Sequence, residues 1–297
     1  MSEHLQILAA HAGWTGDPAT LVEIVDAAAT RFETPCGDGT MAWRRWGTPR
    51  ADRTPLVLLH GGSGSWTHWI KNIPALTQLG EVWAADLPGL GDSAMPHPPH
   101  TPATSGHVVA TGLKQLFPEH QRLHLLAFSF GAHVGTFASA ELWQRLTTFT
   151  LCGSAALGLP HNYLEFERER ATMTKAESDA VHRTNLQRLM FKDPSRIDAL
   201  AIYTHAANIR RARFKSRTFA SSNDIPETLP RVRAQLRAIW GAHDAVATPS
   251  VEARYEILRR THPELQTRTI PDAGHWAAYE QPEAFNDAIL DLTGFGR

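Results

Sequence analysis

At Ala127-Phe128-Ser129-Phe130-Gly131, a short apolar run at 123–128 changes into a segment, 131–142, whose apolar residues have helical spacing. The pentapeptide approximates G-x-S-x-G, with alanine in the first small position. This pattern marks a sharp strand-to-helix turn that projects a serine from the end of a sheet. Small residues flank the serine because the backbones of the strand and the helix approach closely there. The alternative is that Ser129 is a helix N-cap, and the pentapeptide alone does not separate the two interpretations.

On both sides of this turn, short apolar runs alternate with segments of helical length. This alternation predicts a parallel sheet with helices on both faces. A turn signal at 35–39, between 31–34 and 41–46, predicts a β-hairpin at the sheet edge. The remaining strands are predicted at 55–60, 81–86, 123–128, 146–152, 234–240 and 265–270, and helices at 66–79, 104–116, 131–142 and 282–292.

The alternation breaks at 157–231, which is polar, rich in arginine and lysine, and free of strand-like runs. Helices are expected there at 165–176, 177–190 and 195–213. We predict a helical cap, or lid, at 157–231, inserted into an α/β core formed by 31–156 and 232–297. Residues 1–30 are interpreted as an N-terminal extension with an amphipathic helix around 21–29. The predicted fold class is α/β, a mostly parallel doubly wound sheet with an inserted helical lid.

The composition argues against several classes of partner. The chain has 297 residues and a net charge of −1, a balance that favours neither a nucleic acid nor a membrane surface. The apolar stretch at 5–10 lacks the basic start and the length of a signal peptide. Two cysteines cannot form a disulfide framework, so we expect a reducing, cytoplasmic setting.

A glycine-rich loop, His60-Gly61-Gly62-Ser63-Gly64-Ser65, follows the strand predicted at 55–60. Backbone N–H groups in such a loop can face a substrate oxygen, so Gly62 and Phe130 are predicted to form an oxyanion hole. A phosphate-binding loop would require a following Gly-Lys-Ser/Thr, which is missing. We expect His60 to be structural and to lie beneath the loop.

Asp244 and His275 each follow a predicted strand, at 234–240 and 265–270. Neither stands out alone, because aspartate is common in turns and the chain has 16 histidines. Together with Ser129 they occur in the chain order Ser, Asp, His, and each lies at the carboxyl end of a strand. This pattern predicts a catalytic triad with Ser129 as nucleophile, His275 as base and Asp244 as the acid that orients it.

From about residue 30 onward, the chain resembles the α/β-hydrolase superfamily. Its segment Asp86-Leu87-Pro88-Gly89-Leu90-Gly91-Asp92-Ser93 matches the D-x-P-G-x-G-x-S fold marker of that superfamily. The ending Gly274-His275-Trp276-Ala277-Ala278-Tyr279-Glu280 is similar to that of the meta-cleavage product hydrolases, and His60-Gly61-Gly62 fits them too. The resemblance to this subgroup implies hydrolysis of carbon–carbon bonds in ring-opened aromatic dienoates.

Several positions depart from the subgroup. Its elbow is usually of S-M-G-G type, whereas this chain has Ser129-Phe130-Gly131-Ala132, and His68 stands where an asparagine is common. The subgroup also uses a cap arginine to hold the substrate carboxylate. Arg210, Arg211 and Arg213 lie near the expected region, but none aligns securely. These departures favour an ester over a dienoate as substrate.

The predicted function is a serine hydrolase that cleaves a carboxylic ester of a small or medium, largely apolar substrate through an acyl-enzyme. Carbon–carbon bond hydrolysis, acyl transfer to another acceptor and non-catalytic ligand binding on the same scaffold remain alternatives. A small molecule is the expected partner, without metal or cofactor, and a homodimer is left open. Substrate contacts are predicted at Gly61, Ser63, His68, Trp69 and Trp276, with Trp66, Phe130, Phe166 and Met190 as further candidates for the pocket lining.

Overall fold

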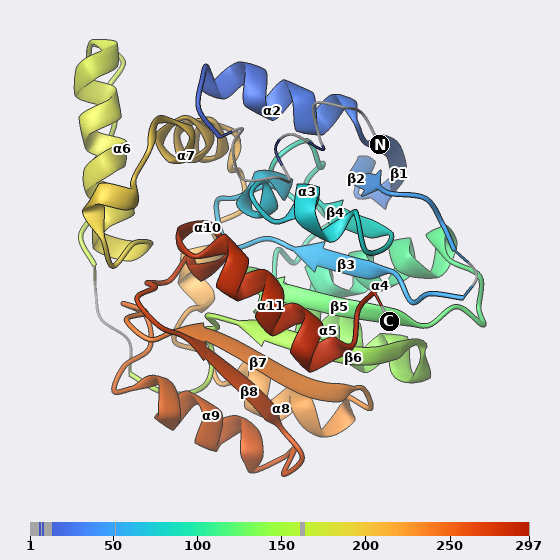
Figure 1. Cartoon of the computed structure of the whole chain (residues 1–297). Coiled ribbons are helices and arrows are strands. Elements are labelled where there is room, and N and C mark those ends of the chain that lie inside the picture. The colour runs from blue at the N-terminus through green and yellow to red at the C-terminus, as the bar shows by residue number, and fades with distance from the viewer. Residues whose placement is uncertain (1–5, 7, 9–13, 51, 161–163, 297) are drawn as a thin grey trace.

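The computed structural model describes residues 6, 8, 14–50, 52–160 and 164–296. The apolar stretch predicted at 5–10 therefore lies largely outside the described residues. The described strands form one eight-stranded sheet in the order β1-β2-β4-β3-β5-β6-β7-β8 (Figure 1). Their bounds are β1 (Thr30–Cys36), β2 (Gly39–Trp46), β3 (Leu56–Leu59), β4 (Val82–Ala85), β5 (Leu123–Phe128), β6 (Leu146–Cys152), β7 (Gln235–Gly241) and β8 (Gln266–Ile270).

The pairing of the strands follows from their sequences. β1 and β2 form the predicted antiparallel hairpin, and β2 pairs antiparallel with β4. All pairs from β4 through β8 are parallel. The central strands β3 and β5 are buried along their whole length, as expected for strands covered on both faces. The predicted α/β class with a mostly parallel sheet is confirmed.

Helices cover both faces of the sheet (Figure 1). Along β5, Leu125 points into one core cluster and Leu126 into the other, because successive side chains of a strand alternate between faces. One cluster contains residues of α4 (Pro102–Leu116), α5 (Phe130–Leu142), α8 (Asp224–Thr228) and α9 (Val251–Arg259). The opposite cluster contains residues of α2 (Pro18–Ala27), α3 (Ile73–Leu76), α10 (Ala277–Glu280) and α11 (Pro282–Thr293).

The single helix predicted at 66–79 is wrong. Two short elements take its place, the 3-10 helix η1 (Trp66–Trp69) and α3. Pro74 lies in the first turn of α3 and has no N–H with which to continue a helical ladder from the preceding turn. Helix α9 was not anticipated, although Ser250 caps it by accepting from the Ala253 N–H at 3.1 Å.

The segment between β6 and β7 contains α6 (Lys175–Leu189) and α7 (Ala199–Arg211), which Figure 1 shows beside the carboxyl ends of the strands. The short elements η3 (Pro194–Arg196), η4 (Ser216–Phe219), α8 and η5 (Leu229–Arg231) complete it. The prediction of a helix at 165–176 is wrong for the described residues 164–174. Asn185 accepts from the Glu167 N–H and donates to its carbonyl, both at 2.9 Å, and α6 begins only after its Thr174 cap. The role of 157–231 as a lid remains a prediction.

The two cysteines lie in the core. Cys36 and Cys152 are both free and buried. Burial raises the pKa of the Cys36 thiol to about 11 and that of Cys152 well above its ordinary value. Because the thiolate is the reactive form, we expect the folded protein to resist a thiol reagent at neutral pH and the denatured protein to take up two equivalents. Rapid labelling of either cysteine in folded protein, followed by mass spectrometry, would contradict this.

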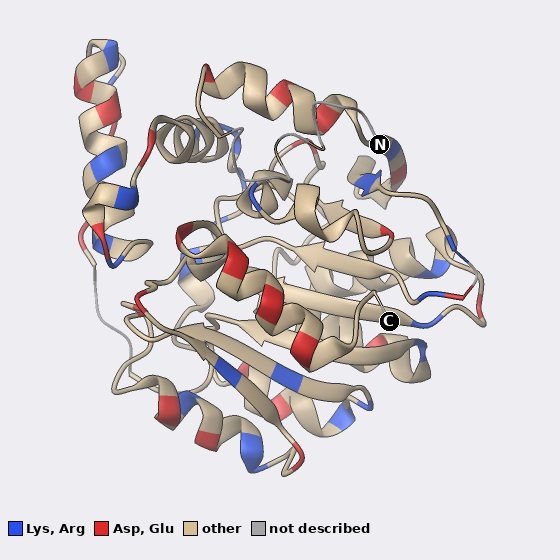
Figure 2. Ribbon diagram, in the orientation of Figure 1, with Lys and Arg blue, Asp and Glu red and all other residues tan. Residues whose placement is uncertain are grey.

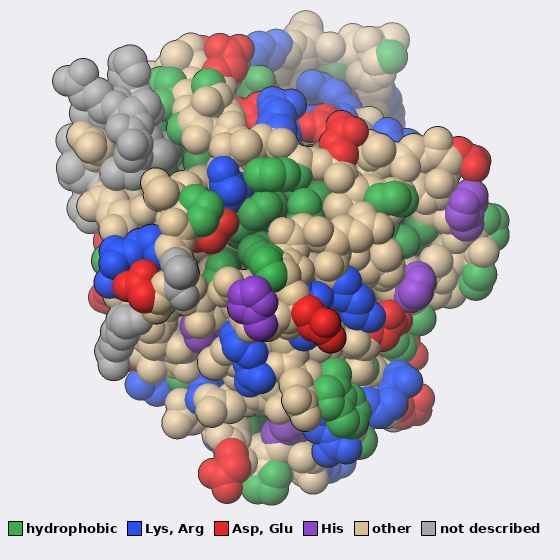
Figure 3. Space-filling model, turned by 90° about the vertical axis from the view of Figure 1, so that its right-hand side faces the viewer, with side chains coloured by type: hydrophobic (Ala, Val, Ile, Leu, Met, Phe, Trp, Pro, Cys, Tyr) green, Lys and Arg blue, Asp and Glu red, His purple; other side chains and the backbone are tan. Residues whose placement is uncertain are grey.

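Charged residues of both signs are interspersed over the outer helices and loops, and β3 and β5 contain none (Figure 2). The face at the amino ends of the parallel strands shows the same mixture, with a group of hydrophobic side chains near its centre (Figure 3). The mixture of both signs agrees with the nearly equal numbers of basic and acidic residues, which give a net charge of −1. Within the described part of the chain, no helix has the length and apolar character that spanning a membrane requires.

Candidate active site

Ser129 occupies the sharp turn between β5 and α5. Its backbone has φ 51° and ψ −117°, a strained conformation for a residue with a side chain. The Ser129 N–H is held by the Cys152 carbonyl of β6 at 2.8 Å. A Cβ on Gly131 would lie 2.7 Å from the Leu59 carbonyl oxygen, so only glycine lets α5 approach β3 this closely. The Ser129 side chain makes no helix-capping hydrogen bond, which argues against the alternative interpretation as an N-cap.

The Ser129 hydroxyl instead faces His275. The distance between Ser129 Oγ and His275 Nε2 is 3.0 Å. On the other side of the ring, His275 Nδ1 lies 2.9 and 3.0 Å from the two Asp244 carboxylate oxygens. Since the carboxylate accepts, Nδ1 carries the proton and Nε2 is free to accept from the serine hydroxyl. The structure thus brings the three predicted residues into one hydrogen-bonded chain.

The site lies where the strand order reverses. The chain passes from β3 to β4 on one side and returns to β5 on the other side of β3. Ligands of open α/β sheets bind in the crevice that such a switch creates at the carboxyl ends of the strands. The glycine-rich loop follows β3 and Ser129 follows β5, so both flank this crevice. A Cβ on Gly61 would lie 3.3 Å from the Ser129 Cβ.

The loop that carries Asp244 is fixed by the backbone and by a buried arginine. Asp244 accepts from the Val246 N–H at 2.8 Å, while Arg254 of α9 donates to the carbonyls of Val246 at 2.7 Å and Thr248 at 3.0 Å. Gly153, with φ 54°, directly follows β6 and lies beside Asp244 and His275. A Cβ there would lie 3.2 Å from both Asp244 Oδ2 and His275 Nδ1. The positive φ and this tight spacing both favour glycine beside the carboxylate–imidazole contact.

Two buried histidines support the glycine-rich loop. His60 donates from Nδ1 to the Gly61 carbonyl at 2.7 Å and accepts at Nε2 from the Leu87 N–H at 2.9 Å. His68 accepts from the Gly61 N–H at Nδ1, at 3.2 Å. Burial lowers the pKa of both imidazoles, so they act as neutral hydrogen-bonding groups. His60 makes structural contacts, as expected from the sequence.

The N–H groups of Gly62 and Phe130 remain as candidate donors to a substrate oxygen. Gly62 N–H has no hydrogen-bond partner among the described residues, and Phe130 begins α5, where first-turn N–H groups have no acceptor within the helix. A Cβ on Gly62 would lie 3.5 Å from the Phe130 Cβ, so the two residues are neighbours. This arrangement suits a developing oxyanion next to Ser129; that role stays a prediction.

The two tryptophans predicted to contact substrate lie in the core, and substrate contact by either remains a prediction. Trp69 and Trp276 are each 1% exposed and belong to the core. Trp69 packs near the rings of Phe128 and Phe285, and Trp276 donates from Nε1 to the His68 carbonyl at 2.8 Å. Large aromatic side chains contribute most when their apolar surface is removed from water, and here they support the loops from behind.

The other predicted contacts have varied positions. His68 is buried and already holds Gly61, whereas Ser63 is half-buried with φ 49° in the glycine-rich loop. Phe166 is half-buried, with the Arg217 guanidinium 3.7 Å from its ring centroid. Met190 is buried, and its carbonyl accepts from the Trp276 N–H at 2.8 Å. Substrate contact by Gly61, Ser63 and His68 remains a prediction.

Arg210, Arg211 and Arg213, which follow α6 in the chain, all have partners within the described residues. Arg210 forms an ion pair with Glu169 at 2.5 Å. Arg211 pairs with Asp92, and Arg213 donates to the Ser93 carbonyl. Arg210 and Arg211 are thus each paired with a carboxylate in this structure, whereas Arg213 contacts a backbone carbonyl.

Glu280 is a site residue that the sequence did not reveal. Its side chain is buried and accepts from the Gly274 N–H at 2.7 Å, next to His275. It also accepts from the N–H groups of Lys192 at 3.1 Å and Asp193 at 2.8 Å, just after α6. A carboxylate that accepts several backbone N–H groups makes strong, charge-assisted hydrogen bonds. Glu280 therefore ties the His275 loop to the segment between β6 and β7.

Removing the Glu280 carboxylate is expected to loosen the His275 loop. Glu280→Ala leaves three N–H groups without this acceptor, of which that of Gly274 is buried, and a small displacement of a catalytic group can cost about 100-fold in rate. We expect kcat to fall by about 10–100-fold and the melting temperature to fall as well. Glu256→Ala, which removes an exposed carboxylate from α9, serves as the control. Wild-type kcat in Glu280→Ala would rule out a positioning role.

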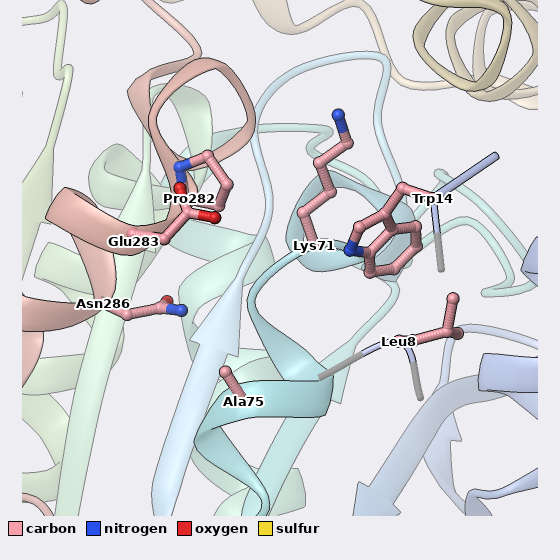
Figure 4. A pocket seen from close by; sticks show the side chains of 7 residues that line it. All are labelled: Leu8, Trp14, Lys71, Ala75, Pro282, Glu283 and Asn286. Carbon is pink, nitrogen blue, oxygen red and sulfur yellow. The ribbon is translucent and has the colours of Figure 1, made fainter. Parts of the chain in front are cut away.

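A small pocket lies apart from these residues, between the N-terminal segment, the η1–α3 region and α11 (Figure 4). Trp14 and Lys71 lie on one side of it, opposite α11. Lys71 also pairs with Asp198 at 2.8 Å. Within the described ranges, no group of three or more His, Cys, Asp or Glu residues is suited to a metal ion. The pocket lining is Leu8, Trp14, Lys71, Ala75, Pro282, Glu283 and Asn286.

Known proteins share this architecture. The chain is 26% identical over 293 residues to the 2-hydroxy-6-oxononadienedioate/2-hydroxy-6-oxononatrienedioate hydrolase of Cupriavidus pinatubonensis, covering 93% of this chain and 99% of that protein. It is 29% identical over 247 residues to the dihydrolipoyllysine-residue acetyltransferase component of the acetoin cleaving system of Pseudomonas putida. That match covers 80% of this chain but only 62% of the relative's length.

A thermophilic esterase from Thermogutta terrifontis superposes with a TM-score of 0.63 at 22% identity, covering 89% of this chain and 97% of that one. Likeness at this level of identity concerns the fold. A family model described as the alpha/beta hydrolase family matches residues 56–288, which run from β3 into α11 and include Ser129, Asp244 and His275. With more than half of its length matched, the chain belongs to the alpha/beta hydrolase family and is an enzyme of that hydrolase type.

Proposed function

We propose that this enzyme is a serine hydrolase that cleaves a carboxylic ester through an acyl-enzyme. The observation that carries the proposal is the hydrogen-bonded chain from the Ser129 hydroxyl through His275 to Asp244. His275 and Asp244 are shielded from water, with side chains 2% and 0% exposed, while Ser129 is only half-buried. An accessible hydroxyl with a shielded base fits a nucleophile that meets its substrate at the surface of the crevice.

In this mechanism, His275 Nε2 takes the hydroxyl proton as Ser129 Oγ attacks the ester carbonyl carbon. Asp244 holds the Nδ1 proton and stabilises the imidazolium that forms. The N–H groups of Gly62 and Phe130 donate to the carbonyl oxygen as it becomes negatively charged. The imidazolium then protonates the departing alcohol, and a water molecule, deprotonated by the same imidazole, hydrolyses the acyl-enzyme and restores the serine.

An ester is preferred to a dienoate because of the groups around the site. A dienedioate carries two carboxylates, which bind most strongly to unpaired cationic side chains. Arg210 and Arg211 are each paired with a carboxylate, and Arg213 contacts a backbone carbonyl. Phe130, which directly follows Ser129, has an apolar neighbour: its ring centroid lies 5.2 Å from that of Phe214. Apolar surroundings of this kind suit an uncharged acyl group.

Carbon–carbon bond hydrolysis is the second candidate. It is supported by the similarity along nearly the full length of the Cupriavidus pinatubonensis dienedioate hydrolase. The segment around His275, which is similar to the ending of the meta-cleavage hydrolases, supports it as well. The same triad would serve either reaction, so the substrate series below is designed to separate them.

The segment 157–231 is proposed to act as a lid that sets the shape of the substrate and limits access of water. Its contacts with the His275 loop through Glu280 support this role. A cytoplasmic location is part of the proposal, supported by the two free, buried cysteines.

The decisive experiment compares p-nitrophenyl esters of increasing acyl length with a ring-opened aromatic dienoate, using wild-type enzyme in parallel assays. We expect turnover of one or more esters, with kcat/KM for the best ester above that for the dienoate. Faster turnover of the dienoate would favour the carbon–carbon bond hydrolase. A fluorophosphonate probe tests the scaffold itself, because folded protein that is not labelled at Ser129 would indicate a non-catalytic ligand-binding protein.

A further inference from the structure

Ser216, at the start of η4, approaches the glycine-rich loop from the cap segment. A Cβ built on Gly62 would overlap Ser216 Oγ, lie 3.1 Å from Ser216 Cβ and lie 3.5 Å from Phe130 Cβ. The Ser216 side chain therefore occupies the space that a side chain on residue 62 would need. Its hydroxyl lies beside Gly62, and Gly62 neighbours Phe130, the second residue whose N–H group is a candidate oxyanion donor.

The Ser216 hydroxyl belongs to a largely buried residue but is itself still accessible. The residue is 9% exposed, and its Oγ forms no hydrogen bond with the described residues, although it is not one of the fully buried hydroxyls without a partner. An accessible hydroxyl that is not engaged within the protein can donate to a bound molecule. A hydroxyl that points to a substrate oxygen gains its partner only when the substrate is bound.

The backbone around Ser216 is held on the core. The N–H groups of Arg213 and Phe214 both donate to the Gly89 carbonyl, at 2.9 and 3.1 Å, and the Ser216 N–H donates to the Phe214 carbonyl at 3.1 Å. The Phe214 ring packs against Phe130, with ring centroids 5.2 Å apart. A donor fixed in this way needs no reorganisation when charge develops, which is the condition for effective electrostatic catalysis.

We propose that the Ser216 hydroxyl is a third donor to the oxyanion that forms at Ser129, in addition to the N–H groups of Gly62 and Phe130. The inference rests on the proposed acyl transfer at Ser129. With this role, Ser216 makes the segment between β6 and β7 contribute a catalytic group in addition to its proposed function as a lid. A donor that acts on the oxyanion strengthens its hydrogen bond in the transition state and so contributes to kcat more than to KM.

The test removes the hydroxyl in two ways. Ser216→Ala deletes it, and Ser216→Cys keeps a side chain of similar size with only a weak donor. Ser216→Thr retains the hydroxyl. Ser222→Ala is the matched control, because it deletes a hydroxyl without a partner from the same segment, at a position where that hydroxyl is fully buried. The measurements are kcat and KM on the best p-nitrophenyl ester, the rate constant of inactivation by a fluorophosphonate, and the melting temperature.

Loss of one oxyanion donor typically lowers kcat by about 10²–10³-fold. We expect Ser216→Ala and Ser216→Cys to lower kcat by about 100-fold with little change in KM, and to slow fluorophosphonate inactivation in parallel. Ser216→Thr should retain most of the activity, and Ser222→Ala should match wild type. If both variants that lack the hydroxyl keep wild-type kcat and inactivation rates, or change only KM, the Ser216 proposal is overturned. Wild-type protein that fluorophosphonate does not label would overturn the proposed function instead.

Discussion

Ser129→Ala is expected to lower kcat by at least about 10⁴-fold, the scale on which loss of a serine nucleophile is felt in triad enzymes. The substitution removes the atom that attacks the substrate and keeps the Cβ, so the turn between β5 and α5 retains its shape. In this structure the hydroxyl contacts His275 Nε2 at 3.0 Å. Its removal therefore leaves the melting temperature close to that of wild type.

Ser139→Ala is the matched control for this experiment. Ser139 lies on the same helix, α5, and its buried hydroxyl has no partner, so the substitution deletes the same group away from His275. Steady-state kinetics and thermal unfolding of both variants separate chemistry from stability. If Ser129→Ala kept wild-type kcat, another nucleophile would have to carry the reaction, and the proposed mechanism would fail.

The sheet and the positions of the triad were predictable because their signals are local. The runs around β3 and β5 are continuously apolar, as strands buried on both faces must be. Parallel strands present their carboxyl ends at one edge, so residues that follow them in sequence converge there. For this reason Ser129, Asp244 and His275 could be placed together although 146 residues separate Ser129 from His275.

Residues whose roles depend on long-range packing were not predictable. Glu280 acts through backbone N–H groups of residues 192 and 193, and no local pattern links these positions. The same holds for the predicted helix at 165–176. Its composition is helical, but the Asn185 side chain of α6 forms hydrogen bonds with both the N–H and the carbonyl of Glu167. This interaction exists only in the folded chain. Trp69 and Trp276 lie in the core, and their sequence context could not show this because aromatic residues suit a core as well as a pocket.

The segment between β6 and β7 contacts the site from two sides. On one side, the N–H groups of Lys192 and Asp193 share the Glu280 carboxylate with Gly274, next to His275. On the other side, Ser216 occupies the space beside Gly62. A displacement of this segment would thus affect both the base and the proposed oxyanion donors. Substrates that hold the segment in place are expected to raise kcat as well as affinity.

Asp244→Asn is expected to lower kcat by about 10⁴-fold while the protein stays folded. The carboxylate accepts hydrogen bonds from both the His275 Nδ1–H and the Val246 N–H. An asparagine has one oxygen acceptor and an NH₂ donor in the same volume. If its oxygen stays with Val246, at the Oδ1 position, its NH₂ group takes the Oδ2 position 3.0 Å from Nδ1 and competes there with the oxygen, because it can donate only to an unprotonated Nδ1. This favours the tautomer with the proton on Nε2, which then cannot accept the proton of Ser129.

The control for this variant is Asp272→Asn, which changes an exposed carboxylate near the His275 loop, where Asp272 pairs with Lys192 at 2.7 Å. We expect its kcat to stay within about twofold of wild type, since exposed ion pairs contribute little. Both variants are compared by kcat, fluorophosphonate labelling and circular dichroism. A folded Asp244→Asn enzyme with undiminished kcat would show that His275 needs no carboxylate to orient it. The proposed catalytic role of Asp244 would then be wrong.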